Sequence, residues 1–287
     1  MSVEKIMDKS KQSEQEKLIG HHPDKHEFFS KYIKCQDLPV TPKKIHRKLT
    51  EDDEHKIIDN LDLIIEYVIN HHYSPGDIKR KRKILKEVGG FERCSEKDWN
   101  FPSSILTQKG NFAEILLSEY LKSCSNLSLL VYRLRYNPNI DQSMKGDDVL
   151  LIDTKDFKKI IIGEAKFRTN PNKSVIKEII QGVDSKKGLP ISLPFIAEII
   201  QDEDKKLAED IERLNIEIST EKINIVNVGF LLSNPYAFRC IEQYDGDLDI
   251  DNFLFISLGI DNPENIVTES FKLAVKKLNN QNQNNGK

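Results

Sequence analysis

The feature that most constrains the fold is a pair of apolar segments of strand length joined by a short polar turn. They occupy residues 144–167, MKGDDVLLIDTKDFKKIIIGEAKF. Two short β-rich segments around such a turn are typical of a β-hairpin. In the second segment, IIIG at 160–163 precedes Glu164 without a polar residue, which indicates a strand buried on both faces. The hairpin is therefore expected in a sheet that is covered on both sides.

Further strands and helices alternate around this hairpin. Apolar composition and spacing predict strands at 127–136, 148–153, 159–167, 222–233 and 252–260, and helices at 107–123, 172–188, 195–218 and 262–278. Three strands in succession, followed by a helix that crosses over to further strands, favour a mixed sheet. The predicted fold class is α/β, a mixed central sheet flanked by helices.

Residues 1–100 have a different pattern, which is mainly helical and irregular. The segment 51–72 starts with acidic residues and continues with apolar residues at helical spacing, and SPG at 74–76 ends it. We therefore expect three parts: a helical accessory or partner-docking region at 1–100, a core domain at 101–278, and a disordered polar tail at 279–287.

Charge and residue usage exclude several classes of protein. The net charge of −3 gives no bulk support for a nucleic-acid partner, so local patches must provide it. The four cysteines lie far apart, which argues against a zinc ribbon or a disulfide framework. All seven histidines lie at or before His72, so chemistry in the remaining chain must proceed without imidazole.

Membrane insertion and secretion also lack a signal in this sequence. No apolar run approaches the roughly 18–20 residues that a membrane helix needs. The N-terminus, MSVEKIMDKSKQSEQEK, is too polar for a secretory signal. We expect a cytoplasmic protein without a membrane partner.

The hairpin brings charged residues to one end of the predicted sheet. Side chains alternate along a strand, so Glu164 and Lys166 project to the same face. Asp148 opens the neighbouring strand, and an antiparallel register around the turn places it beside Glu164. Charges at the end of a buried strand are costly unless they are paired or bind something.

Two carboxylates and a lysine suit metal-dependent phosphodiester hydrolysis. Hard oxygen ligands select Mg²⁺ or Mn²⁺, and a lysine can orient water or stabilise developing charge. The alternative is an ordinary hairpin with solvated charges, because the ExK pattern also occurs at 54–56 and 203–205. Both of these are in polar surroundings, whereas Glu164 follows an apolar strand.

The helix ahead of the hairpin adds a third acid. In KGNFAEILLSEYL, Glu114 lies among apolar residues, where a core-facing acid would need a function. Glu114 could also simply border the apolar stripe of that helix. A helix with an acid, a D…ExK hairpin and a second helix are nevertheless a rare combination.

This combination resembles the PD-(D/E)xK nuclease superfamily, which has the restriction-endonuclease-like fold. Asp148, Glu164 and Lys166 match its D…ExK motif, and Glu114 matches the acid of its first helix. The sequence departs from the pattern because KGDD, without a proline, precedes the strand, and Asp147 could take the place of Asp148. The resemblance implies metal binding by Asp148 or Asp147, by Glu164 and by the Ala165 carbonyl, with Lys166 positioning water.

A narrower resemblance covers residues 70–275. The segments KGNFAEILLSEYL, YRLRYNPN, MKGDDVLLI and GEAKFR are similar to the HamA family, the nuclease subunits of Hachiman antiphage defence systems. That resemblance implies a bacterial cytoplasmic deoxyribonuclease that needs Mg²⁺ or Mn²⁺. It also implies a HamB-like helicase subunit of superfamily 2 as its partner.

Nucleic-acid contacts are expected from two sets of residues. The first is the basic cluster KRKRK, namely Lys79, Arg80, Lys81, Arg82 and Lys83, which could neutralise several phosphates or could be a solvated helix face. The second lies on the helix after the hairpin, where Lys177 could contact phosphate and Gln181 could reach the site, although such residues are more often exposed on a helix surface.

Two other functions are compatible with the sequence. One is a catalytically inactive nuclease-like module that binds nucleic acid or a partner protein. The other is a restriction endonuclease with a defined recognition site. The sequence alone does not separate these from the deoxyribonuclease.

Overall fold

The computed structural model describes residues 12–41, 44–89, 99–142, 144–184, 190–218, 220 and 222–280. Its strands are β1 (Ile33–Asp37), β2 (Ile45–Glu51), β3 (Val149–Ile152), β4 (Lys159–Phe167), β5 (Asn224–Ser233) and β6 (Phe253–Gly259). Within the described residues they form one six-stranded sheet in the order β1-β2-β6-β5-β4-β3. The predicted tail at 279–287 falls largely outside these residues.

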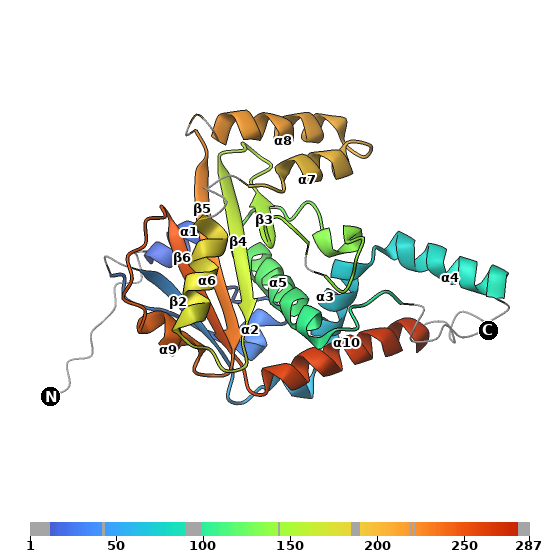
Figure 1. The fold of residues 1–287 in the computed structure, drawn as a ribbon, viewed down its shortest axis with the longest axis horizontal. Coiled ribbons are helices and arrows are strands. Elements are labelled where there is room, and N and C mark those ends of the chain that lie inside the picture. The colour runs from blue at the N-terminus through green and yellow to red at the C-terminus, as the bar shows by residue number, and fades with distance from the viewer. Residues whose placement is uncertain are drawn as a thin grey trace.

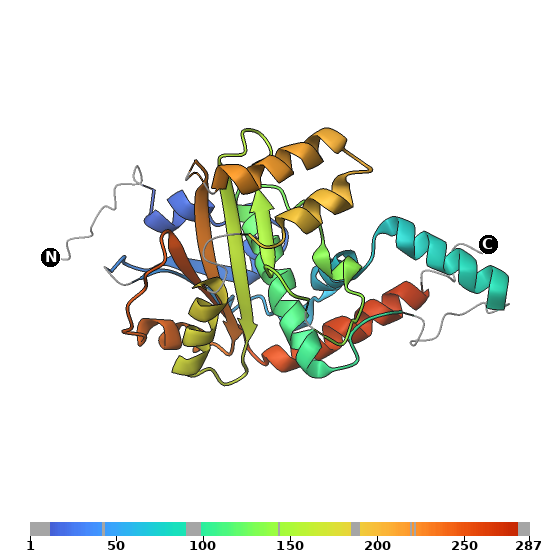
Figure 2. The same cartoon turned by 45° about the horizontal axis from the view of Figure 1, so that its top comes forward.

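The helices surround this sheet on both faces (Figure 1). They are α1 (Glu14–Ile19), α2 (Phe29–Tyr32), α3 (Asp62–His72), α4 (Pro75–Gly89), α5 (Ile105–Cys124), α6 (Lys173–Asp184), α7 (Leu193–Ile200), α8 (Lys205–Ile218), α9 (Ala237–Glu242) and α10 (Pro263–Asn280). Seen again in Figure 2, α4 extends away from the sheet beside the end of α10.

The sheet is mixed, which confirms the predicted fold class. β4, β5, β6 and β2 run parallel to one another, while β3 and β1 are antiparallel strands at the two edges. The hairpin pairs Val149 with Gly163, and continuing this register sets Asp148 opposite Glu164. The register predicted from the sequence is therefore confirmed.

The prediction that 1–100 is helical and irregular missed two strands. β1 and β2 form an antiparallel pair, and β2 runs parallel to β6, with Ile45 opposite Leu254. The sheet thus crosses the boundary expected at residue 100. These strands escaped the sequence pattern because several buried positions of β2, among them His46 and Arg47, are polar.

The strand predicted at 127–136 is wrong. This segment makes a single antiparallel bridge, between Ser128 and Ile152, and then turns into a 3₁₀ helix at Arg133–Tyr136. The turn carries Arg133 inward, where its guanidinium donates hydrogen bonds to carbonyls of the loop before β3. The chain therefore covers the edge of β3 instead of extending the sheet.

Two predicted helices are also divided differently. The segment 51–72 ends β2 at Glu51, and α3 begins only at Asp62, because the Glu51 carboxylate accepts the N–H of Ile57 and caps a separate short turn. The predicted helix at 195–218 is a hairpin of α7 and α8, which turns at residues 201–204.

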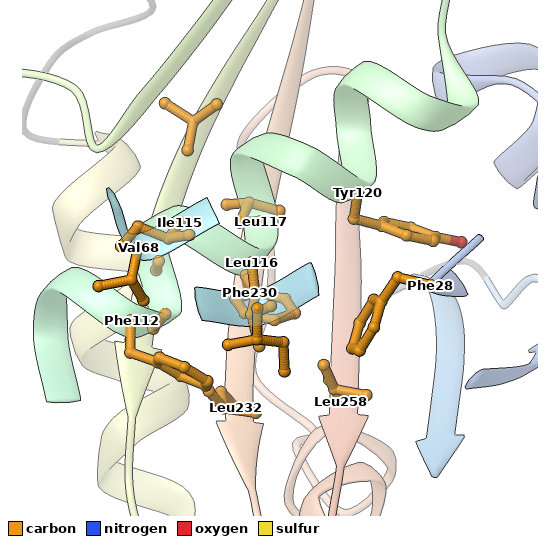
Figure 3. Packing of buried hydrophobic residues seen from close by; sticks show 14 of the residues in the cluster. Phe28, Val68, Phe112, Ile115, Leu116, Leu117, Tyr120, Phe230, Leu232 and Leu258 are labelled. Carbon is orange, nitrogen blue, oxygen red and sulfur yellow. The ribbon is translucent and has the colours of Figure 1, made fainter. Parts of the chain in front are cut away.

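Alternating side chains of the strands divide the core between two layers. On one face, α5 packs on the sheet together with α3 and α10, with its Phe112 and Leu116 beside Leu232 and Phe230 of β5 (Figure 3). Tyr120 points instead toward Phe28, and its hydroxyl lies 3.5 Å from Arg47 Nη1 of β2. On the other face, α7 and α8 cover β3 and β4, and α6 and α9 cover β5 and β6. Burying both faces explains the continuous apolar run of β4.

Across the described residues, no helix combines the length and apolar character needed to span a membrane.

Candidate active site

The open end of the β3–β4 hairpin brings together the residues of the D…ExK motif. Asp148 immediately precedes β3, and its Oδ2 accepts a 2.8 Å hydrogen bond from the backbone N–H of Ala165. The N–H and C=O of one strand residue point to the same side. The Ala165 carbonyl is therefore directed to the side on which Asp148 lies.

Glu164 and Lys166 form an ion pair on one face of β4. Lys166 Nζ donates to Glu164 Oε1 at 2.6 Å, and the Glu164 side chain is only 9% exposed. Burial by itself lowers the pKa of Lys166, but the hydrogen bond to Glu164 and the negative charges of Glu164 and Asp148 together outweigh burial, so the pKa lies above its ordinary value. Lys166 is therefore an ammonium at neutral pH and can only donate hydrogen bonds.

Helix α5 contributes Glu114, whose carboxyl is buried. A close approach of α5 to β4 makes this possible, because a Cβ on Gly163 would lie 2.8 Å from Leu117 Cδ2. Burial raises the pKa of the Glu114 carboxyl well above its ordinary value, and the charge of Asp148 raises it further. Among the described residues, no side chain or backbone group hydrogen-bonds to Glu114 Oε2.

Arg133 holds the loop that leads into β3. It donates to the Asp147 carbonyl and, at 2.9 Å, to the Met144 carbonyl, while its Nη1 lies 3.7 Å from Asp148 Oδ1. One guanidinium therefore fixes the loop backbone and partly neutralises Asp148. The sequence did not indicate Arg133, since nothing in RLRY marks one arginine as inward-facing.

Asp147, the other candidate for a metal ligand, is directed toward α7. Its Oδ2 accepts the N–H of Ser192 at 3.0 Å, and its own N–H donates to Ser192 Oγ at 3.0 Å. Asp147 is 1% exposed. This reciprocal pair ties the start of α7 to the loop before β3, and the geometry favours Asp148 as the metal ligand.

A small pocket opens beside these acids. Glu114, Asp147, Asp148, Arg133 and His71 contribute its polar wall. The remaining lining residues are mostly apolar: Leu129, Val131, Leu134, Leu150, Phe195 and Ile196, with Ser118, Tyr132 and Ser192. The presence of His71 was not expected, because the histidines all precede the core segment in sequence; only the fold of α3 against α5 brings one here.

The donor set fits a hard divalent cation. Asp148 and Glu164 supply carboxylates, and the unsatisfied Glu114 Oε2 is a buried oxygen that a cation or its bound water would satisfy. Among the described residues, no three His, Cys, Asp or Glu side chains enclose a ready-made metal cage. A Mg²⁺ site here would therefore use two carboxylates, the Ala165 carbonyl and water, as open Mg²⁺ sites commonly do.

The basic cluster Lys79, Arg80, Lys81, Arg82 and Lys83 lies on α4, away from the acids (Figure 1). Several of its cations have protein partners. Arg82 donates to the Leu278 carbonyl at 3.1 Å, Arg80 pairs with Asp77 at 2.6 Å, and Lys81 lies over the Trp99 ring at 5.4 Å. The cluster is thus an exposed arm anchored partly to α10.

The other predicted nucleic-acid contacts and the rival motifs are exposed. Lys177 and Gln181 lie on α6 with exposed side chains, one turn apart. The ExK stretches at 54–56 and 203–205 are in turns or at a helix start, and their glutamates face solvent. Only Glu164 combines the motif with burial.

Comparison with known proteins identifies a family. The model of a family described as HamA matches residues 26–274. The chain is also 38% identical over 268 residues to the Hachiman protein HamA of Bacillus cereus, an alignment that covers 92% of this chain and 96% of that protein.

Proposed function

The chain belongs to the HamA family, and from this premise we propose that it is a Mg²⁺-dependent deoxyribonuclease of Hachiman antiphage defence. It would hydrolyse phosphodiester bonds in the bacterial cytoplasm, together with a helicase subunit. The family membership implies the defence role. The nuclease activity, the metal and the helicase partner are our proposals.

The observation on which the proposal rests is the convergence of four ionisable groups at one sheet end. Asp148 continues the register of β3 to lie opposite Glu164, Lys166 pairs with Glu164 at 2.6 Å, and the charges of Asp148 and Glu164 both act on buried Glu114. Burying several like charges together is unfavourable for folding. It is explained if a cation is bound there.

Each residue has a distinct role in the proposed reaction. Asp148, Glu164 and the Ala165 carbonyl would hold Mg²⁺, which when bound activates water and neutralises charge on the phosphate. Lys166, as an ammonium, would orient the attacking water by donating a hydrogen bond and would stabilise the charge that develops on the phosphate. Glu114, whose raised pKa favours the neutral acid without metal, would support the metal and, once ionised beside the cation, would accept a proton from this water.

The basic arm on α4 would bind nucleic acid outside the site. Lys79, Arg80 and Lys83 are more exposed to solvent than Arg82, which contacts α10. Lysine and arginine contacts with phosphate increase affinity without reading sequence. Lys177 and Gln181, on the exposed face of α6, would add contacts on the other face of the sheet.

Cleavage of plasmid and linear DNA by the purified chain, with and without its helicase, tests the proposal. We expect cleavage that needs Mg²⁺, stops with EDTA, and is lost in Lys166→Ala. Lys205→Ala is a matched control, because it changes the lysine of an exposed ExK stretch. Cleavage that persists in Lys166→Ala would contradict the assignment.

The same experiment separates the other two functions. An inactive binding module predicts no cleavage by the chain or its complex, and intact phage defence after Glu164→Ala. A restriction endonuclease predicts discrete fragments, whereas the proposed nuclease predicts a heterogeneous product.

A further inference from the structure

Gly182 of α6 lies directly against the carboxylate of Glu164. A Cβ built on Gly182 would be 2.5 Å from Glu164 Cδ and 2.6 Å from its Oε1. Both distances are far shorter than the roughly 3.5–4.0 Å at which non-bonded carbon atoms normally meet. The present position of the Glu164 carboxylate is therefore compatible only with glycine at 182.

The helix cannot simply move away from the sheet. Its apolar side, with Ile179 and Val183 among the buried residues, packs against β5 and β6. Gly229 of β5, which is the residue opposite Glu164, allows the same close approach, because a Cβ there would lie 2.5 Å from Ile179 Cγ2. Two glycines, Gly182 on α6 and Gly229 on β5, thus set how closely α6 approaches the sheet beside Glu164.

The local backbone provides no other reason for glycine at 182. The residue lies within α6, where alanine would stabilise the helix relative to glycine. The glycine is therefore unfavourable for the helix itself, and its contact with Glu164 is what distinguishes this position from other helical positions.

We infer that Gly182 is a positioning residue for the proposed nuclease site. By leaving no side chain beside Glu164, it sets the carboxylate where it pairs with Lys166 and where it would hold Mg²⁺. This inference rests on the proposed function and adds a residue outside the D…ExK motif to the site.

A methyl group at 182 would displace the carboxylate and leave the fold intact. The atoms that it would meet are the end of a flexible side chain, which moves more easily than backbone. Rotation of Glu164 would break its 2.6 Å contact with Lys166 and shift a metal ligand. Changing a residue that orients a metal ligand typically weakens metal affinity or activity by about 10- to 100-fold.

Gly182→Ala tests the inference, with Gly110→Ala as a matched control. Gly110 also lies inside a helix, α5, and a Cβ there would meet nothing within 4 Å. We expect both variants to keep or raise the melting temperature. Only Gly182→Ala should lose about tenfold or more in Mn²⁺ affinity, measured by calorimetry, and in DNA cleavage by the complex.

The variant Glu164→Asp identifies the contact as the cause. Its shorter side chain leaves room for a methyl group at 182, so adding Gly182→Ala to Glu164→Asp should weaken Mn²⁺ binding less than about twofold. Equal losses in both backgrounds, or unchanged Mn²⁺ binding in Gly182→Ala, would overturn the inference while the proposed function stands. If the unaltered protein neither binds Mn²⁺ nor cleaves DNA, the proposed function itself fails.

Discussion

The two ends of the sheet both bury charged residues, but they treat them differently. At the β1–β2 end, Arg47 is 1% exposed and donates to both carboxylate oxygens of Asp37, at 2.6 and 2.9 Å, and to the Gly20 carbonyl at 3.0 Å. At the β3–β4 end, Glu114 is buried beside two further acids, and its Oε2 has no partner among the described residues.

This difference distinguishes a hydrogen-bond network that stabilises the fold from a group of residues that binds a ligand. Buried polar groups are normally paired, and the Arg47 network satisfies this rule with protein atoms alone. The group around Glu114 satisfies it only if something else binds. A buried charge is thus evidence of function when its hydrogen bonds remain incomplete, and evidence of structure when they are complete.

The largest expected effect is the loss of activity in Lys166→Ala. Removing a donor that stabilises developing charge typically lowers the rate by about 100- to 1,000-fold. The melting temperature should fall less than in Arg47→Ala, since Lys166 is partly exposed. Initial rates of Mg²⁺-dependent DNA cleavage measure the effect, and a rate within about twofold of the unaltered protein would remove Lys166 from the mechanism.

Arg47→Ala should give the opposite result. Removing one partner of a buried ion pair leaves the other unpaired and costs about 3 kcal/mol of the free energy of unfolding. Urea denaturation followed by circular dichroism measures this loss. Cleavage per folded molecule should be unchanged. A loss of cleavage at a temperature at which Arg47→Ala is still folded would contradict the purely structural role of Arg47.

Glu114→Gln should change how stability depends on pH. The pKa of Glu114 is raised in the folded state, so its contribution is fully present below the ordinary carboxyl pKa and is lost as the pH rises through the folded value. Each unit of that difference corresponds to about 1.4 kcal/mol. Glu114→Gln should therefore be more stable than the unaltered protein at pH 8 without metal, and added Mg²⁺ should reduce the difference.

His46, at the other end of the sheet, provides the contrast for this measurement. Burial lowers its pKa to about 3, and its Nε2 lies 2.9 Å from Ser257 Oγ. Its contribution is present above the ordinary histidine pKa and is lost as the pH falls toward the folded value. His46→Asn should therefore flatten the loss of stability between about pH 6.5 and pH 3. An unchanged acid profile would contradict this assignment.

Asp147→Ala should affect stability more than catalysis. The substitution removes the hydrogen bond that Asp147 Oδ2 accepts from Ser192, which typically costs about 1–2 kcal/mol when the remaining group is buried. Asp148→Ala should instead abolish cleavage. Thermal unfolding and cleavage assays of the two variants distinguish them, and complete inactivity of a folded Asp147→Ala protein would assign the metal to Asp147.

The smallest effect is expected from the arm on α4. Replacing Lys79, Arg80 and Lys83 with alanine should lower DNA affinity severalfold and reduce the slope of log affinity against log salt by up to about 0.9 for each phosphate that is no longer neutralised. The Mg²⁺ requirement should be unaffected. Titrations with labelled DNA at several salt concentrations measure the slope, and an unchanged slope would show that the arm is a solvated helix face.

The hairpin and its register could be predicted from the sequence because apolar segments of strand length mark buried strands directly. The same reasoning failed for β2, since its buried positions include His46, Arg47 and Glu51, whose burial depends on partners elsewhere in the chain. It failed in the opposite direction at 127–136, where apolar residues cover the sheet edge without joining it.

In the candidate site, too, local features could be predicted and features that depend on distant residues could not. Asp148, Glu164 and Lys166 are close in the hairpin, so local spacing was sufficient to bring them together. Whether Asp147 or Asp148 faces the site depends on Ser192, which is 45 residues away in sequence. The contact of Gly182 with Glu164 depends on how closely α6 packs, and no pattern in IIQGVD reveals it.

The pairing of β2 with β6 determines when the central sheet can be completed during synthesis. Ile45 lies opposite Leu254, so the edge of β2 that does not face β1 stays unpaired until one of the last segments is synthesised. Unpaired strands expose backbone groups that join other chains. During synthesis this open edge of β2 is exposed to other chains, whereas the two strands of the D…ExK hairpin are adjacent in sequence and can pair with each other once both have emerged.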